Sequence, residues 1–172
     1  MLTLGAFCLF VMLLLTFYKI LAQSSVTIND AQAGISEMTL ATTYIELAQG
    51  LGFDEATQDS FLTPTEINTL TAPGTLGPDN PPPAGEHLEN DIRYFDDIDD
   101  LKNFEVLDST LTGILGAYRT RFDVNYVNAL DVNTISASRT FVKRLDIKVW
   151  RVSPPSRDTL KMSYVMGYFH FF

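Results

Sequence analysis

Residues 1–18 read MLTLGAFCLFVMLLLTFY and contain no charged side chain, and Lys19 is the first ionic residue of the chain. An uncharged apolar run of this length is near the short end of what spans a bilayer as a helix. Three interpretations compete: a secretory signal peptide cleaved near Gln23, a simple membrane anchor, and an apolar helix that starts in the membrane and later packs against copies of itself. Signal peptides normally carry basic residues before their apolar core, and none precedes this one.

Residues 24–52 favour the third interpretation, because they contain no proline and continue as a helix. Their apolar residues recur at steps of mostly three and four, which is the spacing of one helical face. That face consists of Val26, Ile28, Ala31, Ile35, Met38, Ala41, Ile45 and Ala48. Gly50 and Gly52 predict where the helix ends. A helix of about 50 residues is roughly 75 Å long at 1.5 Å per residue, which is too long for a small head to cover.

We therefore predict three parts in the chain. Residues 1–24 form an apolar helix tip that enters a membrane or the core of a filament. Residues 25–53 form an amphipathic half of the same helix, which packs on the head. Residues 54–172 form a globular, β-rich head. The first part must be buried by lipid or by other chains, because the head has too little surface to reach it.

The head begins with a segment rich in proline and glycine, which predicts a surface loop over residues 57–91. Its most proline-rich part is the loop at residues 63–85. Within this loop, Pro81, Pro82 and Pro83 favour an extended polyproline II conformation. A recognition loop for a proline-binding partner is the alternative.

Three runs in the C-terminal third alternate apolar and polar residues, as strands do in a sheet with one buried face. The apolar faces consist of Phe122, Val124 and Tyr126, then Leu145, Ile147 and Val149, then Leu160, Met162, Tyr164, Met166 and Tyr168. Residues 153–156, Ser-Pro-Pro-Ser, predict the connection between the last two strands. Trp150 falls on the polar face, and the aromatic residues 167–172 should be paired or buried. A long helix with an antiparallel sheet predicts an α+β fold.

Residues 93–104, RYFDDIDDLKNF, place carboxylates between apolar residues that are spaced by three. This spacing predicts a short helical turn whose acidic side chains face solvent or cap the turn. A calcium site is the alternative, because hard oxygen ligands suit Ca²⁺, although the spacing is not that of an EF-hand loop. Its candidate metal ligands are Asp96, Asp97, Asp99 and Asp100. Acid–base catalysis by a pair of these carboxylates is a third interpretation.

Composition and motifs argue against several classes of protein. The chain has 12 Lys and Arg against 21 Asp and Glu, and a formal charge of −9 disfavours nucleic-acid binding, which needs a basic face. The single cysteine, Cys8, cannot form an internal disulfide, and we expect it to pack as a small apolar residue. Of the two histidines, His87 and His170, neither lies in a catalytic motif. We therefore predict no enzymatic activity and no cofactor.

In its arrangement the chain resembles type IV pilins and the pseudopilins of type II secretion. Three stretches carry the resemblance: the apolar run that leads into a long helix, the acidic residues 93–100, and the strand at residues 145–150. The resemblance implies a structural subunit of an extracellular, cell-surface filament, inserted in the inner membrane before assembly. Its partners would be copies of itself or other pilins. The residues expected to hold the assembly together are Met1, Leu2, Leu4, Phe7, Phe10, Val11, Leu13, Leu14 and Phe17.

Two features depart from this family. Its precursors carry a short basic leader that a dedicated peptidase removes, and the resemblance therefore implies a mature chain with an N-methylated Met1. Its members usually have glutamate at mature position 5, where it neutralises the N-terminal ammonium of a neighbour, whereas this chain has Gly5. The main alternative function is a single-span, membrane-anchored extracytoplasmic protein with a soluble β-rich head. A secreted ligand-binding domain or enzyme is the remaining alternative.

Overall fold

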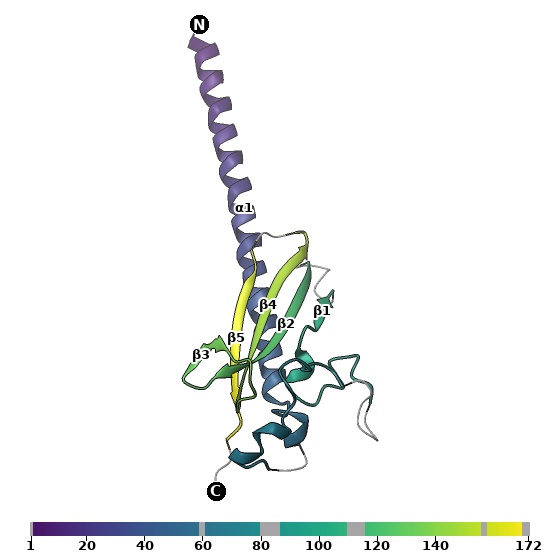
Figure 1. Ribbon diagram of the computed structural model, residues 1–172. Coiled ribbons are helices and arrows are strands. Elements are labelled where there is room, and N and C mark those ends of the chain that lie inside the picture. The colour runs from purple at the N-terminus through teal and green to yellow at the C-terminus, as the bar shows by residue number, and fades with distance from the viewer. Residues whose placement is uncertain (1, 59–60, 80–86, 110–115, 156–157, 170–172) are drawn as a thin grey trace. The chain divides into compact units, whose positions relative to one another are not determined.

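The computed structural model describes residues 2–58, 61–79, 87–109, 116–155 and 158–169 (Figure 1). The chain divides into two compact units, Met1–Ser36 and Glu37–Phe172. A single helix, α1, spans Leu2–Gln49, so it begins in the first unit and ends in the second. The second unit also contains all of the strands.

Helix α1 ends where the sequence predicts, with Gln49 as its last residue, directly before Gly50. The chain then runs alongside the acidic segment. The N–H of Gly52 donates to the carbonyl oxygen of Asp96 at 2.7 Å, and the carbonyl of Gly52 accepts from the N–H of Ile98 at 3.0 Å. A Cβ at position 52 would lie only 3.2 Å from the Asp96 carbonyl oxygen, so glycine permits this close approach.

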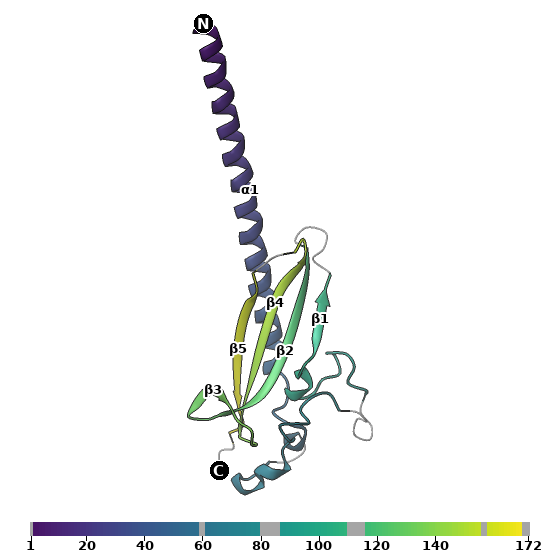
Figure 2. The same ribbon diagram turned by 45° about the horizontal axis from the view of Figure 1, so that its top comes forward.

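The sheet is antiparallel throughout, with its main strands in the order β1-β2-β4-β5 (Figure 2). The bounds are β1 Glu105–Asp108, β2 Ala117–Asn128, β4 Val142–Ser153 and β5 Leu160–Gly167, while β3, Asp131–Ile135, pairs with the end of β2. Three short 3₁₀ helices precede these strands in the described residues: η1 Glu55–Thr57, η2 Pro64–Thr69 and η3 Asp99–Leu101. The predicted α+β fold is confirmed.

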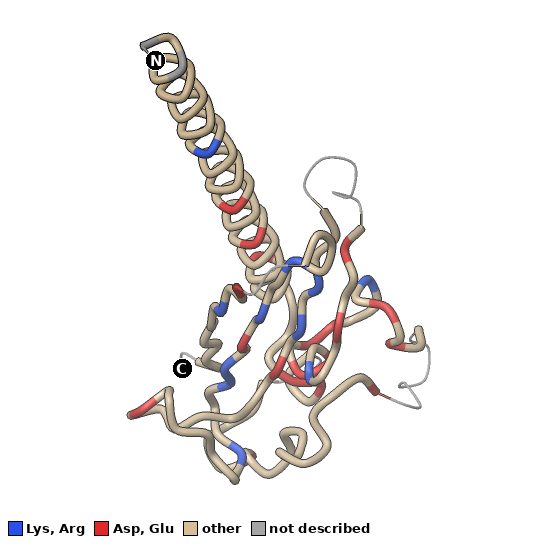
Figure 3. Tube along the Cα trace, turned by 90° about the horizontal axis from the view of Figure 1, so that it is seen from above, with Lys and Arg blue, Asp and Glu red and all other residues tan. Residues whose placement is uncertain are grey.

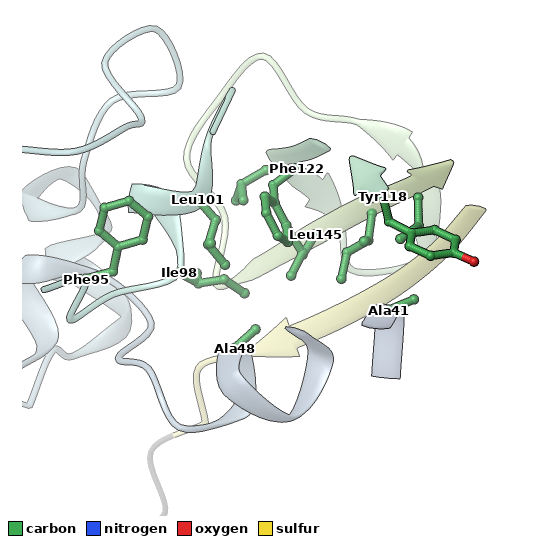
Figure 4. Close-up of a cluster of buried hydrophobic side chains, with 11 residues drawn as sticks. Ala41, Ala48, Phe95, Ile98, Leu101, Tyr118, Phe122 and Leu145 are labelled. Carbon is green, nitrogen blue, oxygen red and sulfur yellow. The ribbon is translucent and has the colours of Figure 1, made fainter. Parts of the chain in front are cut away.

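The core of the second unit lies between one face of the sheet and the last turns of α1 (Figure 4). Ala41 and Ala48 are fully buried there, and their small side chains let the helix lie close to the strands. The ring of Tyr44 meets the ring of Phe122 edge-on at 5.0 Å. Full burial of a large apolar side chain contributes about 1.5–3 kcal/mol to stability. The predicted inward face of β4 is confirmed, and it consists of Leu145, Ile147 and Val149.

A second apolar cluster anchors part of the segment that the sequence predicts as a surface loop. Leu62 and Leu70 are buried against Phe53 and Tyr126. The hydroxyl of Tyr168, just after β5, accepts a hydrogen bond from the N–H of Leu62 at 3.0 Å. The prediction of a surface loop is therefore wrong for these two leucines, whereas Pro81, Pro82 and Pro83 lie outside the described residues.

Three further details differ from the sequence predictions. Val26, Ile28, Ile35 and Met38, which were assigned to the helix face that packs on the head, are all more than half exposed. The sheet covers the later turns of α1, on the face that carries Ala41 and Ala48. Strands β1 and β3 were not predicted, since both are short and half-exposed. The aromatic C-terminus was expected to be paired or buried: Gly167 pairs with Val142 and the N–H of Tyr168 donates to the carbonyl oxygen of Phe141 at 2.9 Å, as expected, whereas Phe169 is exposed. Residues 170–172 lie outside the described part.

Candidate functional sites: an exposed apolar helix and a buried acidic cluster

The part of α1 before Lys19 exposes its apolar side chains on all sides. Phe7 and Leu13 are 65% and 69% exposed, and of the side chains between them all but Val11 are exposed as well. An 18-residue window of this helix has a mean hydropathy of 2.1 with none of it buried, so the helix is long and apolar enough to cross a membrane. An exposed apolar surface of this extent marks a site of contact with lipid or protein.

The predicted assembly residues that the structure describes lie on this surface. Phe7, Phe10, Leu13, Leu14 and Phe17 are exposed, and Val11 is half-buried. Their steps of three and four place most of them on one side of the helix. Leu2 and Leu4 are helical, but their side chains are not described, and Met1 lies outside the described residues.

Polar groups within the apolar helix are satisfied locally. The hydroxyl of Thr16 donates to the carbonyl oxygen of Met12 at 2.6 Å, one helical turn earlier. A buried hydroxyl is costly unless it is hydrogen-bonded, so this bond lets Thr16 enter an apolar environment. At Gly5 nothing lies within 4 Å of where a Cβ would stand, so packing within the chain does not require glycine there.

The acidic segment is buried, contrary to the prediction that its side chains face solvent. Asp97, Asp99 and Asp100 are only 3–4% exposed. Oδ1 of Asp97 accepts from the N–H groups of Asp99 at 2.8 Å and Asp100 at 3.3 Å, and Oδ2 of Asp100 accepts from the N–H of Asp97 at 3.3 Å. The capping part of the prediction is thus confirmed, because these carboxylates satisfy the backbone around η3.

A buried lysine explains why the acidic segment faces inward. Lys143 is fully buried on the inner face of β4, and its Nζ donates to the carbonyl oxygen of Phe53 at 2.6 Å, to Oδ2 of Asp54 at 2.8 Å and to Oδ1 of Asp99. The three N–H donors of the ammonium therefore have three acceptors. The rings of Phe53 and Tyr126 lie 4.7 and 5.2 Å from Nζ, which adds a cation–π attraction.

Asp54 links this lysine to the segment after α1. Its carboxylate accepts from the backbone N–H of Thr71 at 3.1 Å and from the hydroxyl of Tyr126 at 3.1 Å. The ion pairs of Lys143 with Asp54 and Asp99 thus tie β4 to the residues that follow α1 and to the acidic segment. Sequence reasoning missed both Lys143 and Asp54. Lys143 could have been found from the alternating pattern of β4, because it lies two residues before Leu145 and therefore on the same, inward-facing side of the strand.

Burial also changes the protonation of the acidic segment. Burial, and then repulsion by Asp99 and Asp100, raises the pKa of Asp97 to about 10, although Lys143 opposes this shift. Burial and the nearby Glu89 raise the pKa of Asp100 to about 8. Both carboxyl groups are therefore protonated at neutral pH, and the segment carries less negative charge than its sequence suggests.

The predicted calcium ligands separate into two groups. Asp97 accepts hydrogen bonds from backbone N–H groups, and Asp99 forms an ion pair with Lys143. In the second group, one carboxylate oxygen each of Asp96, Asp100 and Glu89 lie within 4.8 Å of one another. Such a group suits a hard cation. A protonated Asp100 that shares a hydrogen bond with Glu89 gives the same closeness without an ion. Glu89 was not singled out in the sequence.

His87, the histidine within the described residues, packs against an aromatic ring. The ring of His87 lies 5.0 Å from the ring of Tyr94 at an exposed position, and His170 lies outside the described residues. Cys8, on the apolar helix, is exposed. The predicted absence of enzymatic activity stays a prediction.

No protein-family model, no curated protein and no solved structure matches this chain. Its function is therefore inferred from the two regions described above.

Proposed function

We propose that this chain is a structural subunit of an extracellular filament of the type IV pilus kind. Its apolar helix lies in the membrane before assembly and packs against the helices of other copies afterwards. The observation that carries the proposal is the uncharged part of α1 before Lys19, whose described side chains are mostly exposed. It is continuous with a helix whose end is built into a head with its own core. A polymer would cover the apolar surface that the chain itself leaves open.

The apolar exposure beyond Lys19 favours a polymer over a simple anchor. From position 2 to position 18 the helix is about 26 Å long at 1.5 Å per residue, slightly less than the ~30 Å hydrocarbon core of a bilayer. Val26, Ile28 and Ile35 follow the first charged residue and are also more than half exposed. Lipid headgroups and water would leave these side chains wet, whereas neighbouring helices would bury them.

A charge placed in the middle of the apolar helix tests the proposal. Leu13→Asp would put a carboxylate among apolar neighbours, where desolvation costs several kcal/mol. We expect it to abolish filaments while the head stays folded. The readout is negative-stain microscopy of material sheared from cells, with immunodetection of the chain.

Leu130→Asp is the matched control, because it makes the same substitution in the head, at a side chain between β2 and β3 that is 96% exposed. It should leave filament yield within about twofold, as surface substitutions usually do. Normal filament yield from Leu13→Asp would rule out the proposed packing. A wild-type chain that is always a detergent-dependent monomer would support the membrane-anchored alternative instead.

A further inference from the structure

Three cations stand side by side on the outer face of the sheet. Arg121 on β2 lies opposite Lys148 on β4, which in turn lies opposite Lys161 on β5. All three side chains are exposed, and we call them the basic row. Side chains directly opposite in an antiparallel pair are about 4.5–5.5 Å apart at Cβ, and like charges in such positions destabilise the sheet. The row therefore has a cost within the isolated chain.

Three carboxylates close to the basic row on the outer face pair with other cations. Glu105, opposite Arg121 on β1, pairs with Arg119 at 2.9 Å. In the next outward-facing row, Asp123 pairs with Lys102 at 2.6 Å and Asp146 with Arg144 at 2.9 Å. Within the described part of the chain, no member of the basic row forms an ion pair. The row is thus open to an external anion.

The surroundings of the basic row are those of a protein interface. A surface depression is lined by the row together with Trp150, Asp158 and Thr159. In the row beyond it, Arg119 lies between Trp150 and Leu107, and Leu107 is exposed. Tryptophan and arginine are enriched at the centres of protein interfaces. A small anion would use the cations but not the adjoining tryptophan and leucine.

The distribution of charge selects the partner. The strands β2, β4 and β5 hold seven of the chain's 12 Lys and Arg, two, four and one respectively (Figure 3). Lys143 is buried among them, and Arg119 and Arg144 pair with carboxylates of the same sheet, whereas the basic row is exposed. The formal charge of the chain is −9, so other surfaces of a second copy offer carboxylates. Repulsion between the net charges of two copies is screened beyond about 8 Å in physiological salt. Nucleic acid presents a much denser negative charge, which the net charge of −9 disfavours.

We propose that the basic row binds carboxylates on the head of a second copy of this chain. The inference rests on the proposed function, because helix packing would hold the heads at a high effective concentration, where weak ion pairs count. The like-charge repulsion within the row would then be relieved only in the assembly. Self-association would acquire a dependence on ionic strength that apolar helix packing alone does not have.

Zero-length cross-linking tests the contact with the full chain. Unlabelled and ¹⁵N-labelled chains are purified in detergent and mixed, the detergent is removed, and a carbodiimide joins lysine amines to carboxylates in direct contact. We expect mixed-isotope peptides, which arise only between chains, to contain Lys148 or Lys161. Lys148→Glu should lower the assembled fraction by about tenfold in low salt. Arg93→Glu makes the same change of charge at an exposed position outside the sheet and should have an effect below about twofold.

The outcomes separate this inference from the proposed function. Assembly without mixed links at Lys148 or Lys161, and with Lys148→Glu assembling normally, would overturn the inference and leave the filament proposal standing. Failure of the chains to associate at all when detergent is removed would overturn both. Binding of a short DNA duplex that is lost in Lys148→Glu, without any mixed links, would assign the basic row to nucleic acid instead.

Discussion

The helix before Lys19 and the head differ in which side chains they expose and bury: the helix exposes apolar side chains, whereas the head buries charged ones. In the helix, Phe7 and Leu13 point into open space, whereas in the head Lys143 is fully buried. Exposed apolar surface is stable when another molecule covers it, and a buried charge is tolerated when partners in the same chain hold it. We therefore expect the helix to need other molecules to cover it and the head to fold by itself.

The sharpest way to break this comparison is to separate the two regions. A chain that begins at Ser25 lacks the uncharged run and keeps the whole of the unit Glu37–Phe172. We expect a soluble monomer that unfolds cooperatively, whereas the full chain should require detergent or a polymer. Sedimentation and thermal unfolding provide the measurement. A truncated chain that aggregates or lacks a cooperative transition would show that the head is not self-sufficient.

The next largest effect concerns the charge that the head buries. Lys143→Met leaves Asp54 and Asp99 buried without their cation, and breaking a buried ion pair from one side typically costs about 3–5 kcal/mol. We expect a loss of this size in the free energy of unfolding, measured with urea. Lys161→Met removes an exposed lysine from the same sheet and should stay within about 0.5 kcal/mol. Equal losses of unfolding free energy in the two variants would mean that the buried ion pairs of Lys143 do not stabilise the head more than an exposed lysine does.

The strands and the acidic segment differ in how far the sequence could predict them. Burial on one face imposes a period of two, so Phe122, Val124 and Leu145 could be assigned inward from pattern alone. The burial of Asp99 could not, because its cause is Lys143, which is distant along the chain. The local pattern of apolar and polar residues indicates which face of a strand is buried. It does not identify a distant residue, such as Lys143, that allows a charged side chain to be buried.

The helix shows the same limit in another form. Its continuity and its end before Gly50 follow from the absence of proline and from glycine's preference for helix ends. Which side meets the sheet does not follow, since alanine and methionine both fit an apolar stripe. The close approach of α1 selects Ala41 and Ala48 and leaves Met38 outside. The group of Glu89 with Asp96 and Asp100 also depends on tertiary folding that no spacing rule contains.

The pH dependence of stability is a smaller test of the protonation of the buried carboxyl groups in the head. The pKa of Asp100 is about 8 and that of Asp97 about 10 in the folded head, against 3.8 when unfolded. Folding therefore takes up protons, and the stability from these groups is fully present below about pH 4 and is lost as the pH rises through 8 and then 10. Carboxyls with a lowered pKa, such as Asp91, are already ionised in both states above pH 5.

We therefore expect the free energy of unfolding of the head to fall between pH 5 and pH 9. Asp100→Asn should flatten this fall, because an amide does not titrate in this range, while the neighbouring Glu89 and Asp97 remain. Urea unfolding across the pH range is the measurement. Stability that rises with pH, or an unchanged slope in the variant, would contradict the assigned protonation.

The smallest expected effect is the response of the head to calcium. Asp97 and Asp99 are occupied by the backbone and Lys143, and protonation already relieves the repulsion between Asp100 and Glu89. We expect no rise in melting temperature with calcium beyond that given by magnesium at matched ionic strength. A rise with calcium alone that disappears in Asp96→Asn would instead make this group a metal site.

The accessibility of Cys8 in sheared filaments tests most directly whether other copies cover the helix. Cys8 is the chain's single cysteine and is exposed on the apolar part of α1. Sheared material contains no membrane, so only neighbouring chains can shield the thiol. A water-soluble maleimide should leave Cys8 unlabelled in intact filaments and label it fully after denaturation. Rapid labelling of Cys8 in intact filaments would contradict the proposal that their core is made of these helices.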